Sequence, residues 1–158
     1  MTSTPRAHLR LEVDQSGKIE TAQDTILAYS NNTGRYAICI PGQVKREILT
    51  HLRQQGKSKT RAVIWVFSVG LFFLLRDVLA RVSWITIDLE YEGHEADIKS
   101  MLMRLARQNG LRIDPDVVTF AAIGKSSGAH EQAIGVFRGQ FKADRIITLA
   151  EFSALSRG

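Results

Sequence analysis

Acidic side chains recur in this sequence beside short runs that alternate between apolar and polar residues, as β-strands do. Asp14 follows the alternating run Leu9–Val13, and Asp88 and Glu90 share one side of the run Trp84–Tyr91. Two residues along a strand separate side chains on one face by about 6–7 Å. Carboxylates that converge from different strands can hold Mg²⁺ or Mn²⁺, because these hard cations prefer oxygen ligands. The spacing indicates a divalent-metal site; the competing interpretation is that these acids are solvated at strand ends.

His130 and Glu131 form a second candidate group, because they open a predicted helix over Ala129–Arg138 after the apolar run Val117–Ile123. Glu131 could supply a third metal ligand, and His130 could orient or protonate a group near a scissile phosphate. A pair of divalent ions held in this way can activate water and stabilise the leaving oxygen in phosphodiester cleavage. The sequence therefore predicts metal-dependent phosphodiester hydrolysis. The candidate catalytic residues are Asp14, Asp88, Glu90, His130 and Glu131, with Asp14, Asp88 and Glu90 as metal ligands.

A short glycine- and serine-containing turn, Gly124–Ser127, joins the apolar run to the helix. It lacks the first glycine of a P-loop, because Thr119 occupies that position inside the predicted strand. Lys125 and Ser126 could still bind a single phosphate at the start of the helix. The alternative is that Ser127 only caps the helix.

Charge is unevenly distributed along the chain. Lysine and arginine total 21 against 16 for aspartate and glutamate, a net charge of +5. Acidic residues crowd into Asp88–Asp97, whereas a basic group precedes them and consists of Lys45, Arg46, Arg53, Lys57, Lys59 and Arg61. A basic flank beside an acidic centre suits an enzyme that grips phosphates and holds a metal, so nucleic acid is the expected partner. A solvated helix face with an acidic first turn is the alternative explanation.

Several functional classes are disfavoured by composition. The single cysteine, Cys39, cannot form an internal disulfide, and the four histidines show no zinc-ligand spacing. The apolar segment Ala62–Leu75 is 14 residues long, shorter than the roughly 20 that a spanning helix needs. It is expected to be a buried helix or strand, with attachment to a membrane as the alternative. The first residues lack the apolar core of a secretory signal, so the cytoplasm is the expected location.

The pattern of elements predicts a loose tail over residues 1–8 and a single α/β domain over residues 9–158, with a mixed five-stranded sheet flanked by helices. Three short strands open the domain, at Leu9–Val13, Asp24–Tyr29 and Arg35–Ile40. A helix over Gln43–Gln55 follows, and then most of Thr60–Arg81 is expected to be a long buried helix, although Ala62–Val69 could instead be a strand. Later elements are a strand at Trp84–Tyr91, a helix at His94–Gln108, a strand at Val117–Ile123, a helix at Ala129–Arg138, an extended piece at Arg145–Ile147 and a terminal helix from Thr148.

This order of elements and acids resembles the ribonuclease H-like (retroviral integrase) superfamily. The resemblance covers about Leu9–Arg138. Leu-Glu-Val-Asp14 matches the first strand of the family, which carries its first acid, and Ile-Asp88-Leu-Glu90-Tyr matches the fourth strand, which carries its second acid. It implies a ribonuclease H-like fold and a metal-dependent nuclease, with His130–Glu131 in the place of the last acid or histidine. Because a fold alone does not confer activity, a non-catalytic module that binds nucleic acid or a partner protein is the alternative. Carboxyls of Asp14 and of Asp88 or Glu90 within about 4–6 Å of each other would favour the metal site.

Overall fold

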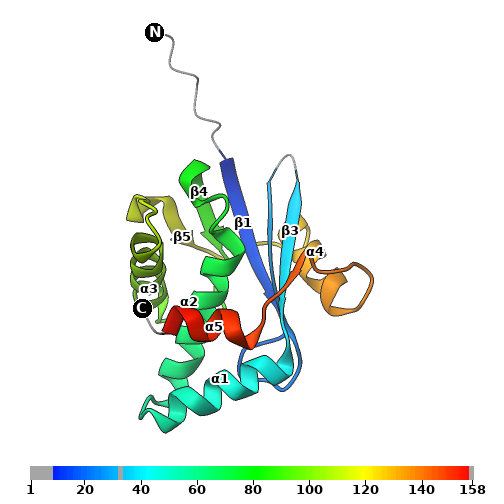
Figure 1. Ribbon diagram of the computed structural model, residues 1–158. Helices are drawn as coiled ribbons and strands as arrows, with labels where there is room; N and C mark the ends of the chain where they lie inside the picture. The colour runs from blue at the N-terminus through cyan, green and yellow to red at the C-terminus, as the bar shows by residue number, and fades with distance from the viewer. Residues whose placement is uncertain (1–8, 32–33, 157–158) are drawn as a thin grey trace.

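The computed structural model describes residues 9–31 and 34–156, which form a mixed β-sheet with helices on both faces (Figure 1). The tail expected over residues 1–8 lies outside this range. The described strands are β1 (Leu9–Ser16), β2 (Thr25–Ser30), β3 (Arg35–Ile40), β4 (Val82–Ile87), β5 (Val118–Phe120) and β6 (Arg145–Ile146). The helices are α1 (Gly42–Gln54), α2 (Lys59–Leu75), α3 (Glu95–Gln108), α4 (Gly128–Phe137) and α5 (Leu149–Ser156).

The sheet has the strand order β5-β4-β1-β2-β3-β6. β1, β2 and β3 form the expected antiparallel meander, while β4 lies parallel to β1, β5 parallel to β4 and β6 parallel to β3. The expectation of five strands is therefore wrong by one, because Arg145 and Ile146 pair with Ile38 and Cys39 and extend the sheet at its edge. This α/β arrangement is compatible with the ribonuclease H-like fold.

The two faces of the sheet bury side chains of different size. One face carries larger residues such as Val13, Leu27 and Ile38, which pack with α1, α2 and α3 in the main core. The other face carries small residues such as Ala28 and Ala37, which form a second cluster with Ala133 of α4. Small side chains on both elements allow α4 to lie close to β1, β2 and β3.

The apolar segment forms one buried helix, α2, and not a strand. Ser58 caps it by accepting a hydrogen bond from the amide of Arg61. α2 ends at Leu75, earlier than the predicted limit at Arg81, and a short 3₁₀ turn, Leu79–Arg81, leads into β4. No helix among the described residues is long and apolar enough to cross a membrane.

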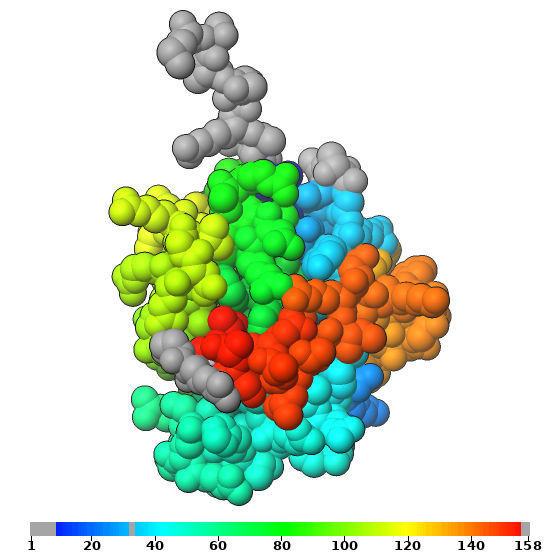
Figure 2. All heavy atoms as spheres, in the orientation of Figure 1, coloured from blue at the N-terminus to red at the C-terminus, as the bar shows by residue number. Residues whose placement is uncertain are grey.

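The C-terminal helix α5 covers the exposed side of α2. Figure 2 shows α5 lying across this face of the molecule, between α1 and α3. Phe152 of α5 is fully buried, and its ring packs against Trp65 and Phe73 of α2. α2 therefore lies at the centre of the main core, enclosed by the sheet and by α1, α3 and α5.

Gly70 marks the closest approach of α2 to the sheet, and its replacement should destabilise the protein. A Cβ at this position would lie 2.8 Å from a methyl carbon of Leu27 and 2.9 Å from one of Ile40. We expect Gly70→Val to lower the free energy of unfolding by about 1–3 kcal/mol through overpacking, measured by urea denaturation. Gly34→Val is the control, because nothing lies within 4 Å of a Cβ at Gly34. Equal stability of the two variants would contradict this packing.

Candidate metal centre

The register between β1 and β4 brings two of the predicted acids together. Val13 pairs with Ile87, and the next amide along, that of Asp88, donates to the carbonyl of Val13 at 3.0 Å. Asp14 and Asp88 follow this pair on the same side of the sheet, since paired residues of parallel strands share a face.

Glu90 reaches the same place by a tight turn. β4 ends at Ile87, so Asp88 and Glu90 do not lie on one strand as the alternation predicts. The amide of Glu90 donates to the carbonyl of Asp88 at 3.0 Å, which folds the chain back within three residues. One carboxylate oxygen from each of Asp14, Asp88 and Glu90 lies within 4.8 Å of the others. This separation falls inside the range that favours a shared metal ion.

Hydrogen bonds from three different elements orient the two aspartates. The amide of Gln15 donates to Asp14 Oδ1 at 2.8 Å, and Asp14 Oδ2 lies 2.8 Å from Nδ1 of His130 on α4. The amide of Ile123, just beyond β5, donates to Asp88 Oδ1 at 2.9 Å. Asp14 is only 6% exposed, so these donors replace the water that its charge loses on burial.

The electrostatics of the site reflect crowded negative charge. Burial and, after it, the neighbouring carboxylates of Asp88 and Asp14 together raise the pKa of Glu90 to about 7, while Lys18 opposes the rise. Burial also raises the pKa of Asp14, against the opposing hydrogen bonds from the Gln15 amide and His130. A cation among these oxygens would relieve both the repulsion and the desolvation.

Tyr91 anchors the segment that carries Glu90, a role that the sequence analysis did not predict. Its hydroxyl accepts hydrogen bonds from Gln15 Nε2 at 3.3 Å and from the amide of Ile19 at 3.2 Å, and it donates to Glu20 at 3.3 Å. Its ring packs against Phe67 of α2, with centroids 4.9 Å apart. The loop after β1 and the turn after β4 are thereby joined next to the carboxylates. Alternation placed Tyr91 among apolar residues, and nothing in the sequence pointed to its hydroxyl.

The donor set of this site fits a hard divalent cation. Three carboxylates supply oxygen ligands of the kind that Mg²⁺ and Mn²⁺ prefer. The same three residues lie around Gln15, whose buried side-chain oxygen Oε1 has no hydrogen-bond partner in the described structure. A buried oxygen of this kind is normally satisfied by a water or an ion. Asp14, Asp88 and Glu90 could therefore hold a metal ion.

The other candidates near α4 lie apart from this group. Glu131 is about half exposed and forms an ion pair with Arg35 at 3.0 Å, so it does not join the three carboxylates. Lys125 and Ser126 are exposed in the turn before α4. Ser127 caps α4, accepting from the amide of Ala129 at 3.2 Å. Ser127 therefore has the capping role that the alternative interpretation of this turn expects.

The predicted basic group does not form a single surface. Lys45 is buried, and its ammonium donates to the carbonyls of Lys18 and Thr21, which ties the loop after β1 to α1. Burial lowers the pKa of Lys45 to about 8. Lys45 is therefore unavailable to a phosphate at the surface, and periodicity missed this because a lysine was assigned to the solvent side. Arg46 is exposed on α1.

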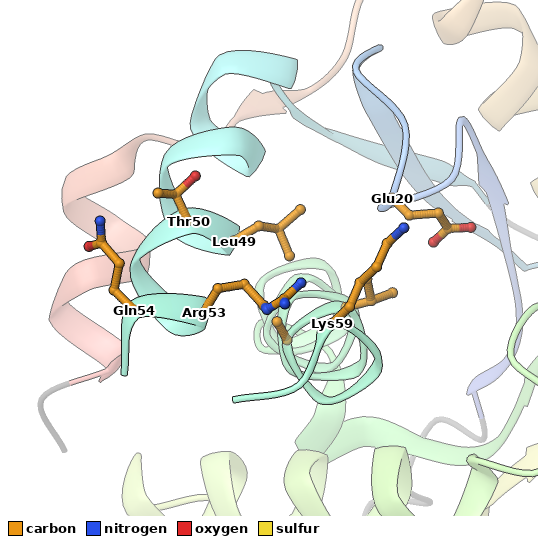
Figure 3. A pocket seen from close by; sticks show the side chains of 8 residues that line it. Glu20, Leu49, Thr50, Arg53, Gln54 and Lys59 are labelled. Carbon is orange, nitrogen blue, oxygen red and sulfur yellow. The ribbon is translucent and has the colours of Figure 1, made fainter. Parts of the chain in front are cut away.

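The remaining four basic residues divide between two hollows. Arg53 and Lys59 line a hollow of about 560 Å³ between α1 and α2, which Figure 3 shows with Glu20 at its far side. Lys57 and Arg61 line a second hollow, of about 330 Å³, between α2 and α3. Its other cations are Arg104 and Arg107, which the sequence analysis did not include because they lie more than forty residues further along the chain.

Comparison with known proteins adds no relative. No family model, no curated protein and no solved structure matches this chain. The geometry of the site is therefore the basis for assigning a function.

The raised pKa of Glu90 predicts a pH dependence of stability. Between the ordinary value of 4.5 and about 7 the folded protein binds more protons at Glu90 than the unfolded chain, so the free energy of unfolding falls as pH rises through this window. We expect Glu90→Gln to flatten this fall in thermal unfolding experiments without metal, and we expect Mn²⁺ to stabilise the native chain more above pH 7 than below it.

Glu92→Gln is the matched control, because the Glu92 side chain is exposed two residues away. It should leave the pH profile unchanged. A Glu90→Gln profile that coincides with the native one would contradict the electrostatic description of the site.

Proposed function

We propose that this protein is a divalent-metal-dependent nuclease, or a related nucleic-acid-processing domain, of the ribonuclease H-like superfamily. The observation that carries the proposal is the convergence of Asp14, Asp88 and Glu90, with one oxygen of each within 4.8 Å of the others. Three converging carboxylates, one buried and two half-buried, with a raised pKa at Asp14 and Glu90, are more typical of functional sites than of solvated surfaces.

The topology supports the superfamily assignment. The strand order β3-β2-β1-β4-β5, with an antiparallel meander followed by two parallel strands, accompanies an acid on β1 and another directly after β4. These are the positions in which the resemblance stated for the sequence places the first two acids. β6 and α5 are additions at one edge and one face, and they do not alter the path between the acidic positions.

The residues of the site would divide the work of phosphodiester hydrolysis. Asp14, Asp88 and Glu90 would hold Mg²⁺ or Mn²⁺, which supplies water activation and charge neutralisation at the phosphate. In the reaction an oxygen of water would bond to phosphorus and release one proton to solvent, the phosphorus–oxygen ester bond would break, and the leaving oxygen would gain a proton. The contact of Nδ1 with Asp14 orients the ring of His130, whose Nε2 would deliver that proton.

The hollow between α2 and α3 suits the phosphate backbone of a nucleic acid. Lys57, Arg61 and Arg107 line it and form no ion pair within residues 9–31 and 34–156. The one acid among its described lining residues, Asp97, lies 3.8 Å from Nδ1 of His94. His94, which follows Glu90 by four residues, lies in the same hollow. The lining of this hollow therefore includes a residue that follows the carboxylate turn closely in sequence. Binding of a polyanion there would release counterions and so supply affinity without sequence preference.

A non-catalytic module that binds nucleic acid or a partner protein is the second candidate. One observation favours it: both carboxylate oxygens of Asp14 already have partners, Gln15 N and His130 Nδ1. An aspartate fixed in this way can stabilise the fold without holding a metal. The cleavage experiment below separates the two candidates.

Cleavage of nucleic acid should depend on the carboxylates and on the metal. We expect the purified protein to cleave at least one member of a substrate panel in Mn²⁺, with RNA–DNA hybrid, branched and single-stranded nucleic acids as members. EDTA, Asp14→Asn and Asp88→Asn should each reduce cleavage to the level without protein. His130→Ala should slow it by about 10²-fold or more, because it removes acid–base assistance.

Glu131→Gln is the control for this series, because its carboxyl pairs with Arg35 outside the metal-ligand group. It should retain cleavage. Cleavage that is equal in native protein and in Asp14→Asn and Asp88→Asn would overturn the proposal, and absence of cleavage with retained binding would favour the module.

Binding should lose salt dependence when the basic hollow is neutralised. For Lys57→Ala combined with Arg61→Ala, we expect weaker binding of single-stranded nucleic acid and a shallower salt slope. Each lost phosphate contact should reduce the slope of log K against log salt by about 0.7, measured by fluorescence anisotropy in EDTA. Lys142→Ala, an exposed cation beyond α4, should leave the slope unchanged, and an unchanged slope in the double variant would contradict this assignment.

A further inference from the structure

Trp84 is a large exposed side chain on the strand that leads to the metal ligands. Its side chain is 41% exposed, whereas its neighbours on the other side of the strand, Ile85 and Ile87, are buried. Trp84, Thr86 and Asp88 alternate with these residues and lie on the opposite face of the sheet. The indole therefore shares a face with the carboxylates of the candidate metal centre.

No helix of the described residues covers this part of the face. α4 packs on β1, β2 and β3 of this face, and its first residue, Gly128, forms the margin of a depression of about 560 Å³. The floor and the opposite side of this depression are supplied by β1 and β4, through Arg10, Glu12, Trp84 and Thr86. Arg35 lies beside Gly128 and is held by its ion pair with Glu131.

The indole contacts an arginine of the neighbouring strand. The guanidinium of Arg10 lies over the ring, 5.8 Å from its centroid, and Arg10 and Trp84 are paired across β1 and β4. A cation–π contact of this kind holds an aromatic side chain in place at the surface. The main core gains nothing from an indole at this position, and Trp84 has no place in it.

The chemistry of the depression fits a nucleobase better than a phosphate. An aromatic ring and an arginine plane are the surfaces on which unpaired bases stack. Glu12, exposed on the floor, already accepts a hydrogen bond from Ser127 Oγ at Oε1, at 3.2 Å. Its carboxylate would repel a phosphate, and its other oxygen can accept a hydrogen bond from the amino group of a base. Thr86 offers a hydroxyl that can bond either edge of a base.

The distance to the metal centre sets the position of such a base. Asp88 follows Trp84 by four positions and lies directly after β4. At the rise of a strand this is about 13 Å, the length of about four nucleotides at the stacked rise of 3.4 Å. A base paired in a duplex has its faces occupied by its neighbours and cannot stack on a protein side chain without leaving the helix.

We propose that Trp84 stacks an unpaired base of the substrate, within about four nucleotides of the phosphate held at Asp14, Asp88 and Glu90. This inference rests on the proposed function and narrows it to nucleic acids that have a single-stranded segment next to the cleavage point. Glu12 would add a preference for bases that carry an exocyclic amino group.

Tryptophan fluorescence tests the contact directly, because the chain has two tryptophans, Trp65 and Trp84. In the variant Trp65→Phe with Asp14→Asn, Trp84 is the single emitter and the nucleic acid is not cleaved. Titration in EDTA with a short single-stranded oligonucleotide should quench the emission to saturation, and a duplex of the same sequence should not. Trp84→Phe with Asp14→Asn, which retains Trp65 beneath α5, should show no comparable quenching.

Affinity provides the second measurement. Trp84→Ala should weaken binding of the single strand by about tenfold, because one base–aromatic stack is lost, and Trp84→Tyr should restore most of it. Glu12→Gln should reduce the difference in affinity between oligo-dC and oligo-dT. Salt-dependent binding without quenching, and with equal affinity for Trp84→Ala, would overturn this inference and leave the proposed nuclease intact. Absence of nucleic-acid binding and of cleavage in the native protein would overturn both.

Discussion

The parallel pairing of β1 with β4 is the constraint on which the rest of the structure depends. It sets Val13 against Ile87 and so leaves Asp14 and Asp88 side by side where the two strands end. A parallel neighbour requires a crossover, which the chain makes after β2 and β3, through α1, the largely apolar α2 and the turn at Leu79–Arg81. The burial of α2 against the sheet therefore stabilises the one register that brings the acids together, and Gly70 permits the approach.

Bringing three carboxylates together costs stability, and the structure offsets part of that cost locally. The amides of Gln15 and Ile123 and the ring of His130 compensate the aspartates. Glu90 has no such donor among the hydrogen bonds described. Its pKa is raised by burial and by the neighbouring carboxylates of Asp88 and Asp14. Tyr91 holds the backbone beside it in place through Gln15 and Ile19. The backbone beside Glu90 is thus fixed, while the charge of its carboxylate has no hydrogen-bond donor among those described. This arrangement is expected of a preformed cation site.

Period-two and period-3.6 patterns predicted β1, α1 and α3, because each of these elements has a more buried and a more solvated face. β2 and β3 were also predicted as strand-like runs, although both of their faces are buried. The patterns did not predict the structure of a segment that is buried on every side, the end of a strand at a turn, or the burial of a single lysine. They could not distinguish a helix from a strand over Ala62–Val69, and they extended β4 past Ile87 although the chain turns at Asp88. Lys45 was placed at the surface because its two backbone acceptors come from a loop about 25 residues earlier, a contact that only the tertiary fold creates.

The net charge of +5 takes on a spatial meaning once the fold is known. The cations flank the helices on one side of the sheet, in hollows beside α2, whereas the carboxylates gather where β1 and β4 end. On the other face, Glu12 and Trp84 precede the carboxylates along the same two strands. In the proposed function, the cations beside α2 would bind phosphates and the depression at Glu12 and Trp84 would bind a base. A single strand that crosses the end of the sheet could contact both regions. A duplex, with its bases enclosed, would satisfy only the cations.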